Sequence, residues 1–203
     1  MSQTYEKKDM NFADYSLKFL HSYFFILILS YLLAIFLVYP QYGLLSIALQ
    51  LSAINLYSYG IHRLTHNLPS SLLNYHMYSH HDKKLGIPRP LELFGEFLCD
   101  LSWFILLAFA QYLLNIKLLS NTLIAFIGIW YSSVHVLNLS LGNSKEHKIH
   151  HTDFDYNYGP PFIDIIFGTL KTEENSDEND KIKNGIIVFF LLKLFQTQTK
   201  LLS

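Results

Sequence analysis

The chain has 203 residues, of which 51% are hydrophobic, 16% aromatic and 15% charged, and its formal net charge is -1 with the histidines neutral. This length argues for one domain, and the low share of charged residues, against roughly 25% in soluble domains, indicates a membrane protein. The sequence has no basic stripe interleaved with aromatic residues, which excludes nucleic acid as a partner, and its single cysteine, Cys99, excludes a disulfide framework, an iron–sulfur cluster or a cysteine-built zinc site.

Four apolar stretches predict an all-α integral membrane protein with four transmembrane helices. They cover residues 17–39, 44–61, 97–116 and 118–139. Each approaches the roughly 20 residues that a helix needs to cross the hydrocarbon core. The first has too long an apolar run for a cleavable signal peptide, and no small-residue cleavage site follows it. Polar side chains in the second, such as Asn55, are expected to face neighbouring helices or a cavity.

The connections between these spans place every clustered histidine on one side of the membrane. Tight turns follow the first and third spans, so residues 62–96 and everything after residue 139 share the side of the N-terminus. Most lysines and arginines of the connecting segments fall on that side, and the opposite loops offer only Lys117. The positive-inside rule therefore predicts that the histidines face the cytoplasm.

Two further segments complete the single domain that we expect over residues 1–203. Residues 173–180 are acidic, with Asn and Ser interspersed, and are predicted to form a solvated linker. The apolar stretch 185–195 is only about half a bilayer long. An interfacial or core-packed helix is therefore favoured over a fifth span.

Nine of the ten histidines fall in three short clusters and one single position. The first cluster is His62 and His66, which are four apart, so both rings project from one helical face and can share a metal ion. The second repeats this spacing with His76 and His80, and the adjacent His81 is turned by about 100° around a helix. The second cluster can therefore reach two metal ions.

The third cluster, His147, His150 and His151, nearly repeats the pattern of the second. His135, near the end of the fourth span, is either a hydrogen-bonded structural residue or a ninth ligand, and His21 is expected to be structural. Nine imidazoles exceed what one tetrahedral zinc can use, so a two-metal site is favoured. Imidazole suits iron, copper, nickel and zinc, so the identity of the ions is open. A histidine-rich patch could also serve as a pH sensor, because imidazole titrates near neutral pH. A sensor would, however, need no helical spacing of its histidines.

The order His-x3-His, His-x3-His-His, single His and His-x2-His-His, threaded through four spans, resembles the fatty acid hydroxylase and sterol desaturase superfamily of membrane di-iron oxidases. The resemblance covers roughly residues 59–170. Its most specific part, residues 146–170, reads EHKIHHTDFDYNYGPPFIDIIFGTL. This stretch is similar to the family's terminal box followed by Asn-Tyr-Gly and Asp-x-x-Phe-Gly-Thr.

The resemblance implies that two iron ions bind to the clustered histidines and that His135 joins them. The implied ligands are His62, His66, His76, His80, His81, His135, His147, His150 and His151. It also implies that Asn157, Tyr158, Gly159 and Asp164 shape the floor of the site. Partners beyond the ligands fix imidazole tautomers, and Asp164 and Asn138 are the candidates for that role.

The activity implied by the resemblance is oxygen-dependent hydroxylation or desaturation of a membrane lipid, fatty acyl or sterol-like, with O2 as co-substrate. Electrons are expected from an external donor such as cytochrome b5 or a reductase, because no heme-binding domain is fused to the sequence. In a eukaryote the expected location is the endoplasmic reticulum. Two other functions are compatible with the same residues: a metal-dependent membrane lipid hydrolase, and a non-catalytic metal-binding membrane protein.

Overall fold

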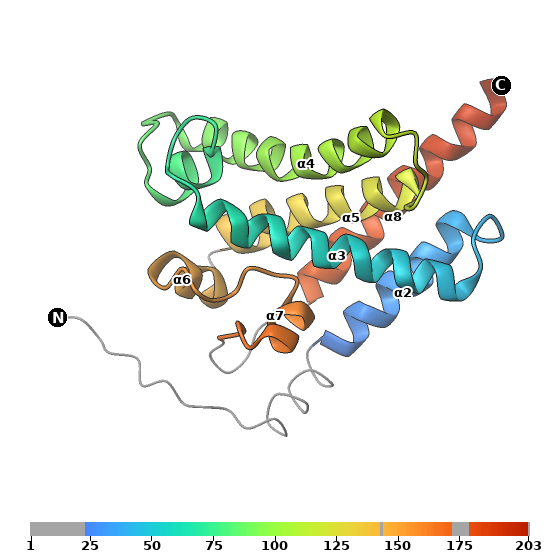
Figure 1. The fold of residues 1–203 in the computed structure, drawn as a ribbon, viewed down its shortest axis with the longest axis horizontal. Coiled ribbons are helices and arrows are strands. Elements are labelled where there is room, and N and C mark those ends of the chain that lie inside the picture. Colours follow the sequence, from blue (N-terminus) through green and yellow to red (C-terminus); the bar gives the residue numbers. More distant parts are fainter. Residues whose placement is uncertain (1–22, 143, 172–178, 203) are drawn as a thin grey trace.

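The computed structural model describes residues 23–142, 144–171 and 179–202. Within these ranges the secondary structure is helical, apart from an isolated bridge between Ser71 and Asn74 (Figure 1). His21, the first part of the predicted first span and most of the predicted acidic linker lie outside the described residues.

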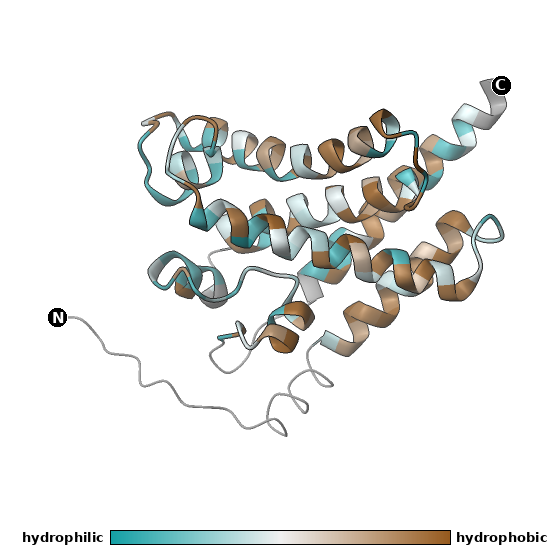
Figure 2. Ribbon diagram, in the orientation of Figure 1, coloured by the Kyte–Doolittle hydropathy of each residue, from teal (hydrophilic) through white to brown (hydrophobic). Residues whose placement is uncertain are grey.

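The long helices are α2 (Phe24–Val38), α3 (Leu44–Asn67), α4 (Arg89–Leu113) and α5 (Asn121–Ser133), the last of which continues as the π-helix η3 (Val134–Leu141). Among the described residues, three helices are long and apolar enough to cross a membrane, namely α3, α4 and the combined α5–η3, and α2 is a shorter apolar helix. Hydrophobic residues cover α2 and much of the other long helices (Figure 2). The chain is thus a multi-pass membrane protein, and a fourth span, of which α2 would form part, stays a prediction.

Small and aromatic side chains hold the long helices together. Ile54, Phe104, Phe126 and other buried residues of α3, α4 and α5 form one apolar cluster. In lipid, close packing rather than expulsion of water favours helix association, and small residues allow it. Gly128 of α5 is such a residue, because a Cβ atom there would lie only 2.8 Å from Cβ of Phe104 in α4.

The last helix, α8 (Asn179–Leu202), packs against α2 and α5 and contains the predicted apolar stretch 185–195. Near its start, Nδ2 of Asn184 donates to Oδ1 of Asn138 at 2.6 Å. Farther along, Nε2 of Gln196 donates to the carbonyl of Leu37 at 3.5 Å. These two contacts fix α8 at both ends of the bundle.

Among the short elements, α6 (Lys145–Thr152) lies on the left in Figure 1, and α7 (Pro161–Phe167) lies below α3, nearer the middle of the view. These two helices and the π-helix η2 (His76–His81) meet the last turns of α3 and η3. Both π-helices carry histidines. Such wide helical turns frequently mark functional sites.

We expect Gly128→Ala to lower the thermal stability of the detergent-solubilised protein. The added methyl group would overlap Phe104, and overpacking costs about 1–3 kcal/mol, more than the gain of about 1 kcal/mol in helix propensity. The matched control is Gly60→Ala in α3, where a Cβ meets no atom within 4 Å. Equal melting temperatures for the two variants would contradict this packing.

Candidate metal centre

The eight clustered histidines and His135 converge at the end of the bundle where the short elements meet. Their candidate ligand atoms form three sets, within each of which the atoms lie within 4.8 Å of one another, and we join the two sets that share His80 into one group. The first group consists of His62, His66, His76 and His150. The second is built around His80, which lies with His81 and His151 and also with His135 and His147. Four separate elements, α3, η2, η3 and α6, supply these side chains.

The winding of η2 explains how one short segment serves both groups. In a π-helix, backbone hydrogen bonds join residues five apart. Nε2 of His81 accordingly lies 3.1 Å from Nε2 of His76, so His81 contacts the first group although it lies with His80 and His151 in the second. His80 reaches the other group, where its Nε2 lies 2.9 Å from that of His151. The sequence analysis assumed an α-helix with His76 and His80 on one face, and the π-helix instead divides them.

Backbone carbonyls orient two histidines of the first group. Nδ1 of His62 lies 2.6 Å from the carbonyl oxygen of Tyr158, and Nδ1 of His150 lies 2.7 Å from that of Tyr156. A carbonyl oxygen can only accept a hydrogen bond, so each Nδ1 must carry the proton. Each Nε2 then has a free lone pair, which is the form that binds a metal ion.

The loop that carries these carbonyls is held by Asp164 of α7. Its carboxylate accepts from the backbone N–H groups of Tyr158 (3.1 Å) and Gly159 (2.7 Å) and from the hydroxyl of Thr169 (2.7 Å). Burial raises the pKa of Asp164 to about 7, and these three bonds oppose the shift. Asn157 and Gly159 have positive φ values of 59° and 63°, which Asn and Gly tolerate best. The predicted site-shaping residues therefore position the carbonyl that His62 contacts.

Two carboxylates that the sequence analysis did not select contact the second group. Oδ2 of Asp100 lies 2.5 Å from Nδ1 of His135, and Oε1 of Glu96 lies 2.8 Å from Nδ1 of His80. All four side chains are buried. The carboxylates therefore contact the ring nitrogen that points away from the centre of the site.

The spacing of acidic residues in α4 could have identified these two carboxylates from the sequence. Glu92, Glu96 and Asp100 recur every fourth residue and share one face of α4, an otherwise apolar helix. Ionisable residues within membrane helices are costly and usually functional.

The sequence predicts Asn138 and Asp164 as partners of the histidines. The structure instead places the side-chain oxygen of Asn138 on Asn184 of α8, and the carboxylate of Asp164 on the backbone N–H groups of Tyr158 and Gly159.

Two of the histidines are held in the neutral form that can bind a metal ion. Burial lowers the pKa of His150 to about 3, with His66 adding to the shift, and lowers the pKa of His151 to about 4, with Lys83 adding to it. Both rings are therefore neutral at physiological pH. In the described structure, the buried Nε2 atoms of His135 and His150 have no hydrogen-bond partner. A buried polar atom without a hydrogen bond lowers the stability of the fold by about 1–3 kcal/mol, and a metal ion bound at the centre would offset this loss. The donor set fits transition-metal ions that prefer imidazole.

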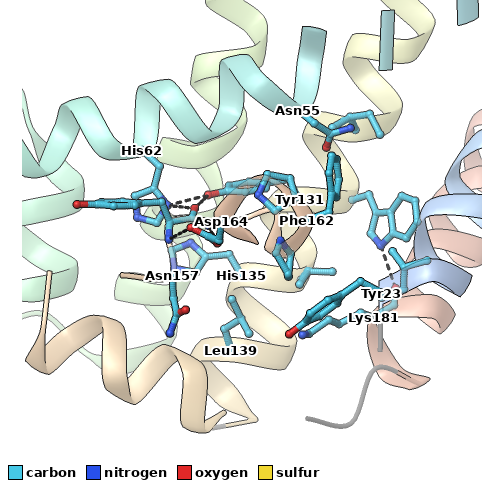
Figure 3. A pocket seen from close by; sticks show the side chains of 18 of the residues that line it. Tyr23, Asn55, His62, Tyr131, His135, Leu139, Asn157, Phe162, Asp164 and Lys181 are labelled. Carbon is cyan, nitrogen blue, oxygen red and sulfur yellow. Dashed lines mark hydrogen bonds between the residues drawn. The ribbon is translucent and has the colours of Figure 1, made fainter. Parts of the chain in front are cut away.

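A largely apolar cavity of about 170 Å³ leads away from the histidines. His62, His135 and His147 line it, together with side chains of α2, α5, α7 and α8. In Figure 3, His62 and Asp164 lie toward one end of the view, and Tyr23 and Lys181 toward the other. The apolar lining includes Ile26, Leu27, Ile127, Trp130, Val134, Phe162 and Leu170. Its shape and chemistry suit a hydrocarbon chain.

Comparison with known proteins adds one match. Residues 47–169, more than half of the chain, match the family model described as fatty acid hydroxylase. No curated protein and no solved structure matches the chain. The matched range runs from α3 to the residues after α7 and includes the eight clustered histidines and His135.

Proposed function

This chain belongs to the fatty acid hydroxylase family, and on that premise we propose that it hydroxylates or desaturates a membrane lipid with an acyl chain at a centre of two iron ions. The observation that carries the proposal is the cavity, because His62, His135 and His147 line it together with apolar side chains. Family membership implies an oxygen-dependent oxidoreductase. The cavity supports a hydrocarbon as the group that is oxidised.

The two groups of histidines would each hold one ion. His62, His66, His76 and His150 would bind the first, and His80, His81, His135, His147 and His151 the second. When bound, the irons would supply the activation of O2 that an unreactive C–H bond requires. The protein's part is to orient the ligands, exclude water and present the substrate.

The residues of the cavity would perform that positioning. Trp130 of α5, Val134 of η3 and Leu27 of α2 would pack against the acyl chain and keep water from the reacting carbon. Tyr131 lines the same cavity, and its hydroxyl lies 3.0 Å from Nδ1 of His62. A methylene group held beside His62 and His135 would therefore be the one oxidised.

The reaction requires electrons from outside the chain. In hydroxylation, one oxygen atom of O2 enters the C–H bond and the other leaves as water, with two electrons and two protons consumed. In desaturation, two hydrogens leave the lipid, and both oxygen atoms become water with the same two electrons and two protons. We propose that cytochrome b5 or a reductase supplies these electrons at the cytoplasmic face, which in a eukaryote would be that of the endoplasmic reticulum.

Expression of the protein in a host that lacks it tests the proposed reaction. We expect lipid extracts to gain a species heavier by one oxygen atom, labelled when 18O2 is supplied, or lighter by two hydrogens. His150→Ala should reduce this product by about 100-fold or more, because even partners outside the ligand shell contribute 10–100-fold. His21→Ala is the matched control, since His21 belongs to no cluster, and it should retain the product.

Two results of this experiment would contradict the proposal. Lipid cleavage that proceeds without O2 or a reductant would indicate the hydrolase alternative. Lipids that are unchanged by the wild-type chain, in the presence of an electron donor, would indicate a non-catalytic metal-binding protein.

A second prediction tests the cavity as the substrate's path. Val134→Phe would fill part of the cavity beside His135, and we expect turnover of long acyl chains to fall by about tenfold, which corresponds to about 1.4 kcal/mol. Leu137→Phe, one turn along the same helix but exposed, is the control. Iron content should be unchanged in both variants. Equal turnover for the two would show that the chain binds elsewhere.

A further inference from the structure

The two groups of histidines differ in what their Nδ1 atoms contact. In the first group, His62 and His150 face neutral backbone carbonyls. In the second, His80 and His135 face the buried carboxylates of Glu96 and Asp100. No negative charge has a comparable place in the first group among the described contacts.

We propose that the two metal positions are unequal, and that Glu96 and Asp100 are positioning residues that make the position of His80 and His135 bind its ion more tightly. This inference rests on the proposed function, because it requires two ions. It adds an order of binding: the second group fills first.

The physical reason is the charge on the hydrogen-bond acceptor. A carboxylate that accepts from Nδ1–H, as Asp100 does from His135, raises the basicity of Nε2 and adds an attractive charge close to the ion, whereas a carbonyl provides only a dipole. Glu96 lies 2.8 Å from Nδ1 of His80 without forming a hydrogen bond, so it acts through its charge. Changing such a partner typically alters metal affinity by about 10–100-fold. Because both carboxylates lie in buried, poorly screened surroundings, their effect on a nearby dication is strong.

The surroundings of the carboxylates hold them in place. Oε2 of Glu96 accepts from the hydroxyl of Ser140 at 3.0 Å, and Oε1 lies 3.3 Å from Nη1 of Arg89. Asp100 lies one helical turn farther along α4 and, among the described residues, pairs with His135 and with no lysine or arginine. Arg89 partly offsets the charge of Glu96, so Asp100 should have the larger effect.

Glu92 provides a matched control on the same face of α4. It is buried and lies one turn before Glu96. Its carboxylate pairs with Lys83 and Arg89 and contacts no histidine in the described structure. Loss of its charge should disturb the helix about as much as loss of the other charges. Because Glu92 shares Arg89 with Glu96, any effect on the ions should be smaller than that of Asp100→Asn.

The test is a titration of the metal-free, full-length protein in lipid nanodiscs with Co²⁺, followed by the visible absorption of the bound ion. We expect the wild-type protein and Glu92→Gln to bind two ions in two steps at least about tenfold apart in affinity. In Asp100→Asn, and more weakly in Glu96→Gln, the first step should weaken by about 10–100-fold and approach the second, which stays unchanged. Asp100→Glu, which keeps the charge, should restore most of the separation.

Each other outcome overturns the inference. Two equal steps in the wild-type protein, or two steps that are unchanged in both Asp100→Asn and Glu96→Gln, would leave the two-ion site standing but remove the inequality. Binding of fewer than two ions by the wild-type protein would overturn the proposed function as well. Asp100→Asn and Glu96→Gln are measured separately, and the melting temperature of each is compared with that of the wild-type protein. Either variant that folds then shows whether its carboxylate makes the affinities for the two ions unequal.

Discussion

The structure depends on one constraint, which is that the Nε2 atoms of the imidazoles around the site must face a common centre. Hydrogen bonds to Nδ1 set that direction, through the carbonyl of Tyr158 for His62 and through Asp100 for His135. Without a cation, buried ring nitrogens such as Nε2 of His135 have no partner. An arrangement this unfavourable by itself is stable only when the surrounding fold imposes it or an ion compensates for it. The helix ends, the loop held by Asp164 and the carboxylates of α4 all serve that arrangement.

The place of the site in the bundle connects this chemistry with a membrane substrate. The long helices α3, α4 and α5–η3 are apolar enough to span a bilayer, and their polar ends meet around the histidines. The cavity between α2, α5, α7 and α8 extends the apolar environment to His62 and His135. An acyl chain bound in this cavity would lie in largely apolar surroundings beside His62 and His135.

Much of this arrangement could be predicted from the sequence, because hydrophobic length and histidine spacing are local properties. The spacing of His62 and His66 placed both in one group, as α3 does. Spacing could not anticipate the π-helix of η2, in which His76 and His80 separate, because winding responds to tertiary packing. The partnership of Asp100 with His135 joins residues 35 positions apart, so only the packed helices reveal it. The motif around Asn157 was visible as a resemblance, but its physical role depends on contacts made by the folded loop.

The central claim is that nine histidines hold two ions without a carboxylate ligand. A crystal structure of the iron-loaded protein, with anomalous data collected at the iron absorption edge, tests it most directly. The account predicts two anomalous peaks, one within bonding distance of Nε2 atoms of His62, His66, His76 and His150, and the other surrounded by His80, His81, His135, His147 and His151. A single peak, or a peak bonded directly to Glu96 or Asp100, would contradict it.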